Sequence, residues 1–448
     1  MPSDGNATAS PFDVTLPNGL RVLYEPMPWL PTLSVTLLMP FGSVTDPIGN
    51  EGSASVLHEW LQRGAGDLDS RALSDAFEDL GVRRGGNAGR ETSTLGAGFL
   101  AADAARALPL LADMVKRPRF ESPEFAPAVE LAQEELRSLE DAPTQKMFEA
   151  LTARFLASPH RRSSLGTPEG LAALTEAGVR ADAADRVGPD GAILALAGGS
   201  TWEQLLPVIE ETFGTWRGAT QPVPAPELAP QGLHHVDAET TQLQVGLAYP
   251  SAQVGTDEGY LYTLALNVLS GSMGARLFTE IREKRGLVYS VSAGTRALRG
   301  LGFTVGYAGT TTERAAETLQ VFLAELDRLA EGVTAEELER SRTGLLSSVV
   351  MRGESSGATA GRLATDAYYL GRARTLAEVS DKIESATLEQ VNEYLAANPV
   401  PTPTIVTLGR LPEGGLGLPA ATVTATATEV GTGTGTATGT DAGTEGRA

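Results

Sequence analysis

The stretch Gly52–Trp60, which reads GSASVLHEW, holds three polar residues whose types and spacing could do chemistry. The pattern predicts the start of a helix that Gly64 closes. Ser55 and Glu59 lie four residues apart and so share one helix face, and His58 lies on that face too. A helix with two imidazoles at this spacing and a carboxylate beside the second, H-x-x-E-H, can hold a zinc ion.

This chain has other residue types at all three positions of that pattern. Ser55 stands at the first ligand position, His58 at the position of the general base, and Glu59 at the second ligand position. A hydroxyl, an imidazole and a carboxylate therefore replace two neutral imidazole ligands and a carboxylate base. An ordinary zinc site is not expected on this helix.

The bulk composition limits the classes of partner and cofactor. The chain has 448 residues, more than one hydrophobic core usually serves, so at least two domains are expected. The net charge of −21 argues against nucleic acid and anionic membrane surfaces as partners, and it suits a cavity that attracts basic peptides. Because there is no cysteine, disulfides and thiolate metal sites are excluded.

The sequence also predicts where the protein works. The start, MPSDGNATASPF, lacks a basic segment followed by an apolar run, so no signal peptide is expected. No apolar stretch reaches the roughly 18 residues of a membrane span. We therefore expect a cytoplasmic protein without a membrane partner.

The order of predicted elements indicates an α+β fold in two similar halves, each a mostly antiparallel sheet with helices packed on one face. The first half covers residues 12–216 and the second 234–418, with a Pro-rich linker at 217–233. Residues 1–11 and the Thr/Gly/Ala tail at 419–448 are expected to be disordered.

Corresponding segments support the internal repeat. The strand–helix–helix run 96–136 corresponds to 304–345, and the apolar strand 191–199 corresponds to 402–410. Within the first half, TLSVTLLM is almost continuously apolar, which predicts a central strand. Two copies of one unit are therefore expected.

Taken together, GSASVLHEWLQRG, IREKRGLVYSV and the duplicated halves resemble the pitrilysin/insulinase-type zinc peptidases. The similarity is to the short, processing-peptidase-like branch with one duplicated unit per chain, and it covers about residues 12–415. Further supporting motifs are LPNGLRV, FGSVTDP, EELRSLEDAP and GSMGARLF. The resemblance implies that the two halves form one half of a clamshell.

The resemblance implies a zinc helix at Ser55, His58 and Glu59, where no residue matches the family pattern. The family's third ligand, a glutamate on a later helix, falls on Glu134 or Glu135. Because a catalytic zinc needs three protein ligands and an open position, one remaining ligand is too few. His58, Glu59 and Glu135 could form a displaced ligand set, or they are an ordinary polar helix face. We favour the polar face and expect no cofactor in this chain.

The family's substrate-binding residues are present in part. The resemblance implies that Arg282 and Tyr289, seven residues apart, bind the substrate carbonyl and its tetrahedral intermediate, as donors aimed at a developing oxyanion. Asn87 and Ala88 match a strand edge to which peptide substrates add. A purely structural Arg–Tyr pair, and a plain turn at Asn87, remain open as alternatives.

Three functions follow from these residues. The first is a subunit without zinc that pairs with a homologous chain carrying the intact motif and acts on oligopeptides or unfolded proteins. It would supply half of the peptide chamber and could form a homodimer when alone. The second is a structural or interaction protein that resembles the core subunits of respiratory complexes. The third is a self-sufficient zinc peptidase with displaced ligands.

Overall fold

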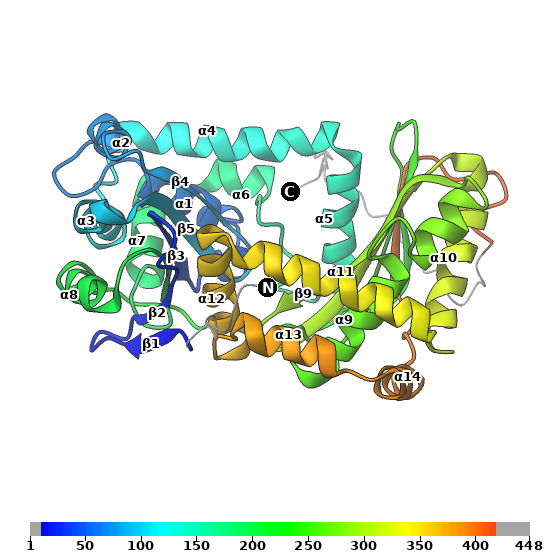
Figure 1. The fold of residues 1–448 in the computed structure, drawn as a ribbon. Helices are drawn as coiled ribbons and strands as arrows, with labels where there is room; N and C mark the ends of the chain where they lie inside the picture. Colours follow the sequence, from blue (N-terminus) through cyan, green and yellow to red (C-terminus); the bar gives the residue numbers. More distant parts are fainter. Residues whose placement is uncertain (1–9, 418–448) are drawn as a thin grey trace, which may run out of the picture.

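The computed structural model describes residues 10–417, which form two β-sheets with helices around them (Figure 1). The chain passes from the first sheet to the second through the predicted linker, whose residues 217–232 lie in no helix or strand. The disorder expected at 1–11 and 419–448 concerns residues outside the described range, apart from residues 10 and 11.

The first sheet has six strands in the order β1-β2-β6-β3-β5-β4. The predicted turn at Pro17–Gly19 joins β1 to β2, and Gly19 has the positive φ of 94° that such a turn requires. The strand predicted to be central, β3, does lie inside the sheet, between β6 and β5. The strands are β1 (Phe12–Thr15), β2 (Arg21–Pro26), β3 (Thr32–Met39), β4 (Arg83–Ala88), β5 (Ser93–Leu100) and β6 (Ile193–Gly198).

The second sheet has five strands in the order β7-β11-β8-β10-β9, which repeats the order β2-β6-β3-β5-β4 of the first. In each sheet one neighbouring pair is parallel, β2 with β6 and β7 with β11, and the other pairs are antiparallel. The predicted duplication of an α+β unit is therefore confirmed. The strands are β7 (Leu233–Val236), β8 (Leu243–Pro250), β9 (Val288–Leu298), β10 (Leu301–Thr310) and β11 (Thr404–Leu408).

The helices of the first half mostly pack on one face of the first sheet. Apolar residues of α1, such as Leu57 and Trp60, are fully buried in the same core as Leu33 and Val35 of β3. The helices are α1 (Ser53–Leu61), α2 (Ser70–Glu78), α3 (Ala104–Lys116), α4 (Ser122–Ser138), α5 (Pro143–Phe155), α6 (Pro168–Ala173), α7 (Glu176–Arg186) and α8 (Trp202–Phe213).

The second half repeats this arrangement with one difference from the sequence prediction. The helix expected over 274–286 is shorter, and its last part, Phe278–Glu283, is π-helical. The start predicted near Thr334 is confirmed by a capping box with Glu337. The helices are α9 (Asp257–Ser270), α10 (Ala315–Leu329), α11 (Ala335–Gly353), α12 (Ser356–Leu370), α13 (Leu376–Ser385) and α14 (Leu388–Ala397). Within residues 10–417, no helix combines the length and the apolar character that crossing a membrane requires.

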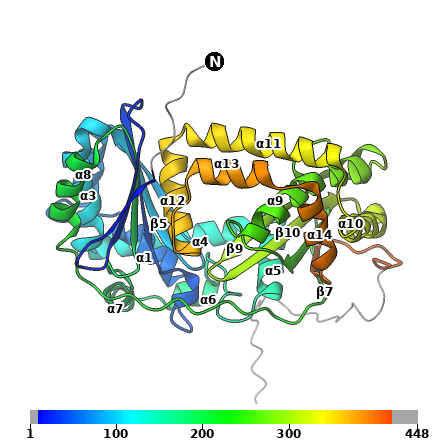
Figure 2. The same ribbon diagram turned by 60° about the horizontal axis from the view of Figure 1, so that its bottom comes forward.

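Each half also sends one helix to the sheet of the other (Figure 2). Leu363 of α12 is buried against Leu23 and Ile193 of the first sheet. Phe155 of α5 is buried against Phe303 and Val406 of the second. Because helices cover both faces, every residue of β6 is buried, as are all but the last residue of β8. The exchange locks the halves together.

Candidate active site

The start of α1 is fixed by a buried acidic residue. The carboxylate of Asp46 accepts hydrogen bonds from the backbone N–H groups of Gly52 and Ala54, both at 2.8 Å, at the end of the helix where negative charge is favoured. Arg186, itself buried, pairs with Asp46 at 3.2 Å. Gly52 has a φ of 107°, and an added Cβ would lie 2.5 Å from the side chain of Leu171. The helix that carries the candidate residues is therefore held rigidly.

One cavity of about 200 Å³ brings the predicted first-half residues together. It lies among α1, the edge strand β4 and α4, whose side chains meet in the folded chain. The predicted residues that line it are Ser55, His58, Glu59, Asn87, Ala88 and Glu135.

The imidazole of His58 is buried, and both of its ring nitrogens have partners. The amide nitrogen of Gln62 lies 3.2 Å from Nε2 and donates to it, so Nδ1 carries the proton and donates to the Ser93 hydroxyl at 2.8 Å. Burial lowers the pKa of His58 from its ordinary value of 6.5 to about 4. The ring is therefore neutral at pH 7 and held by its neighbours.

The carboxylate of Glu59 is also engaged. It pairs with Arg63 at 2.8 Å, and Arg63 in turn reaches Glu124 at 3.1 Å. On the neighbouring helix, burial together with the charge of Glu59 raises the pKa of Glu135. Glu59 and Glu124 thus share an ion pair with Arg63 between α1 and α4, whereas Glu135 takes no part in it.

The residues of this cavity do not fit the zinc ion that the family pattern implies. Ser55 offers only a hydroxyl, His58 has no free ring nitrogen, and Glu59 is bound to Arg63. Among residues 10–417, no three His, Cys, Asp or Glu side chains are grouped so that they could hold a metal ion. No catalytic step of this chain can be assigned to a metal at this helix.

Asn87 and Ala88 lie on an edge strand. They pair with Thr94 and Ser93 of β5, and the other side of β4 has no neighbouring strand in the described sheet. The plain turn considered for Asn87 is therefore wrong. A free strand edge presents backbone N–H and C=O groups to which an extended peptide can add.

Arg282 and Tyr289 lie together in the second half. Arg282 is in the π-helical segment, an irregularity frequent at functional sites, and Tyr289 is near the start of the edge strand β9. The Arg282 guanidinium lies 5.0 Å from the centre of the Tyr289 ring and 4.7 Å from that of Phe278. Tyr289 is 75% exposed, and neither residue lines the His58 cavity. The two residue sets therefore do not share this cavity.

The family is decided by two sequence matches. Residues 21–169 match the model of the insulinase family, peptidase family M16, and residues 178–345 match that of the peptidase M16 inactive domain. The chain belongs to the M16 peptidase family. Its relatives include an uncharacterized zinc protease, YmxG, of Bacillus subtilis, which is 28% identical over 84% of this chain and 93% of its own length. An uncharacterized zinc protease of Mycobacterium bovis is 26% identical over 87% and 91%.

Solved structures share the fold of this M16 chain. An M16 inactive domain from Pseudomonas fluorescens superposes with a TM-score of 0.82 at 21% identity, covering 90% of this chain and 98% of that one. A chain of complex III2 from Candida albicans gives a TM-score of 0.77 at 17% identity, covering 89% and 95%. At these identities the similarity establishes the fold alone.

Sequence reasoning missed the residues that hold the degenerate helix of this M16 chain. Gln62 and Arg63 each follow their partners, His58 and Glu59, by four residues, which is the spacing of neighbours on a helix face. That spacing could have revealed them. Ser93 could not be found in this way, because its contact with His58 depends on how β5 packs against α1.

Proposed function

We propose that this chain is the subunit without zinc of a heterodimeric M16 metallopeptidase. Its partner would be a homologous chain with an intact H-x-x-E-H motif, and zinc is expected there. The observation that carries the proposal is a contrast within one chain. His58 and Glu59 are bound by neighbouring side chains, whereas no hydrogen bond joins the Arg282 guanidinium or the Tyr289 hydroxyl to another described residue.

Arg282 and Tyr289 would act on the substrate carbonyl. The ring of Tyr289 packs against the Arg282 guanidinium, which limits the positions of both groups, while their N–H and O–H donors stay available. Such donors stabilise the negative oxygen that forms in the transition state of peptide hydrolysis. The pair does not line the His58 cavity, which agrees with a site completed by a second chain.

The rest of the chain would receive the peptide. Asn87 and Ala88 on the free edge of β4 are candidates for pairing with an extended substrate. The two halves would form half of a closed chamber, and the net charge of −21 would favour basic peptides. A chamber of this kind selects oligopeptides or unfolded proteins. We place the complex in the cytoplasm, with a homodimer possible when the partner is absent.

Co-expression with a homologous M16 chain that carries the intact motif tests the proposal. We expect the two chains to co-purify and the complex to cleave oligopeptides at least tenfold faster than the motif-bearing chain alone, since one oxyanion donor is typically worth about 100-fold. Equal activity with and without this chain would contradict a helper role.

A second candidate is a purely structural or interaction protein. The similarity of fold to the complex III2 chain from Candida albicans favours it. A stable complex with unrelated proteins, and no effect on any peptidase, would support this candidate. A third candidate is a self-sufficient zinc peptidase. It is kept because relatives of this chain are named zinc proteases. One tightly held zinc per chain in the purified protein would support that alternative.

A further inference from the structure

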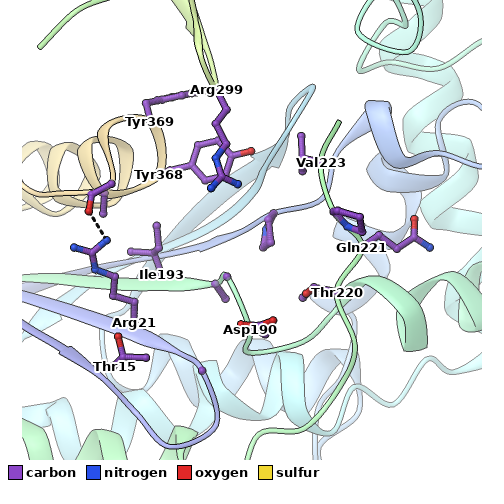
Figure 3. Close-up of a pocket in the computed structure, with 17 residues that line it drawn as sticks. Thr15, Arg21, Asp190, Ile193, Thr220, Gln221, Val223, Arg299, Tyr368 and Tyr369 are labelled. Atoms are coloured by element: carbon purple, nitrogen blue, oxygen red, sulfur yellow. Dashed lines mark hydrogen bonds between the residues drawn. The ribbon is translucent and has the colours of Figure 1, made fainter. Parts of the chain in front are cut away.

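A second and larger cavity lies between the two halves, away from the His58 helix. Its volume is about 710 Å³, within the range of cavities that hold small organic ligands. It shares no lining residue with the His58 cavity. The walls come from the β1–β2 turn, the strand β6 and the segment before it, the linker, the β9–β10 turn and the end of α12 (Figure 3).

One wall of this cavity is fixed by contacts within the chain. Arg21 pairs with Asp13 at 2.6 Å and donates to the carbonyl of Gly371 at 2.9 Å, so it joins β2 to the end of α12. Asp190 lies against the β1–β2 turn, where a Cβ on Gly19 would be only 3.2 Å from its carboxylate. Arg21 is thus occupied, whereas no hydrogen bond or ion pair joins the Asp190 carboxylate to another described residue.

The opposite wall carries two hydrogen-bond donors, the Tyr368 hydroxyl and the Arg299 guanidinium, that have no partner within residues 10–417. Tyr368 of α12 is only 6% exposed, and its hydroxyl has no hydrogen-bond partner among the described residues. A buried hydroxyl without a partner is costly, so it is a candidate contact for a ligand or a water molecule. The Arg299 guanidinium lies 5.7 Å from the centre of the Tyr368 ring, and Figure 3 shows the two side chains together.

Glu91 holds Arg299 in place without neutralising its guanidinium. Its carboxylate accepts from the backbone N–H of Arg299 at 3.0 Å and lies 3.2 Å from Nε2 of His160. Burial and the charge of Glu91 keep the pKa of Tyr368 well above its usual range, so the phenol remains a donor. A guanidinium beside a phenolic O–H is a donor set suited to a carboxylate.

We propose that this cavity binds a short peptide with free ends, whose C-terminal carboxylate is held by Arg299 and Tyr368 and whose ammonium group faces Asp190. The ligand would contact both halves at once, because Asp190 belongs to the first half and Tyr368 to the second. Binding would stabilise the contact between α12 and the first sheet. The inference needs neither the zinc-bearing partner nor catalysis, so it stands apart from the proposed function.

Calorimetric titration of the full chain with tetra-alanine tests this site. We expect saturable binding, and about tenfold or more weaker binding of the C-terminal amide, since charge-assisted hydrogen bonds are lost. Arg299→Gln is expected to have the same effect. Arg296→Gln is the matched control, because Arg296 lies on the same hairpin and its side chain hydrogen-bonds only the adjacent Thr295 carbonyl within the described part of the chain. Tyr368→Phe should weaken binding while keeping the ring.

Several results would overturn the site. Equal binding of tetra-alanine and its amide, or unchanged binding to Arg299→Gln, would exclude a carboxylate held by Arg299. The absence of binding at millimolar peptide would exclude a peptide ligand. Succinate that binds while tetra-alanine does not would reassign the cavity to small organic acids. If Arg296→Gln also lost binding, the peptide would be held by the overall positive charge of the hairpin and not by Arg299 and Tyr368.

Discussion

Acidification should weaken the first half through one histidine. His58 has a folded-state pKa of about 4 against an ordinary 6.5, because its buried ring is held neutral. Between these values the unfolded chain takes up a proton that the folded chain does not. The stabilising contribution is therefore complete above pH 6.5 and is lost as the pH falls towards 4. Linkage gives a loss of about 2 kcal/mol between pH 7 and pH 5, and about 3 kcal/mol by pH 4.

Urea unfolding followed by tryptophan fluorescence measures this effect. All four tryptophans, residues 29, 60, 202 and 216, lie in the first half, so the signal reports the half that contains His58. The wild type and His58→Gln are compared at pH 7 and pH 5. Burial raises the pKa of Asp46 to about 6, but this carboxyl is present in both proteins, so its effect cancels in the comparison. We expect the wild type to lose about 2 kcal/mol more than the variant over this interval.

His235→Gln serves as the control. Burial also lowers the pKa of His235, but that ring is only half-buried and lies in the second half. Its substitution should therefore change the pH dependence of the fluorescence transition by much less than His58→Gln does. A wild type and a His58→Gln variant that lose equal stability between pH 7 and pH 5 would refute a buried, neutral His58.

Three further predictions concern the degenerate helix and the contacts between the halves. The triple variant S55H/H58E/E59H restores H-x-x-E-H opposite Glu135 and should retain about one zinc per chain after dialysis by metal analysis, whereas S55A/H58E/E59H should not. Glu91→Gln should lower the free energy of unfolding by about 1.5–3 kcal/mol in urea titrations, because a charge-assisted bond between the halves is lost, whereas Glu239→Gln at an exposed pair should change it little. Leu363→Ala should cost about 2–5 kcal/mol in the tryptophan signal of the first half, although Leu363 belongs to the second, and the exposed Val350→Ala should not.

The duplicated architecture could be predicted because each strand and helix has a local pattern of apolar residues in the sequence. Alternation in STLGAGFL places Ser93, Leu95, Ala97 and Phe99 on the buried face of β5, as observed. The exchanged helices α5 and α12 were not predicted, because periodicity indicates that a helix has an apolar face but not which sheet covers it. The continuous apolar run of β6, ILALAG, was the available signal that two faces are covered, and every residue of that strand is indeed buried.

The residues of the candidate site could be predicted from the sequence, but the contacts that they make could not. The residues of the degenerate motif were found from spacing, and the structure groups them around one cavity. The side chains that bond to these residues could be identified only once the fold was known. His160 is an example, because it lies in a turn and no sequence pattern marks its side chain as buried. Its side chain is buried beside Glu91, which lies 69 positions away in sequence and bonds the Arg299 backbone of the second half.

The central claim is that this chain supplies oxyanion donors to a metal centre held by another chain. The most direct measurement is kcat/KM for oligopeptide cleavage by the co-purified complex with Arg282→Ala. We predict a loss on the order of 100-fold with unchanged zinc content and assembly. Arg285→Ala, which removes an exposed arginine paired with Glu280, should leave the rate unchanged. An Arg282→Ala complex as active as the wild type would contradict the account.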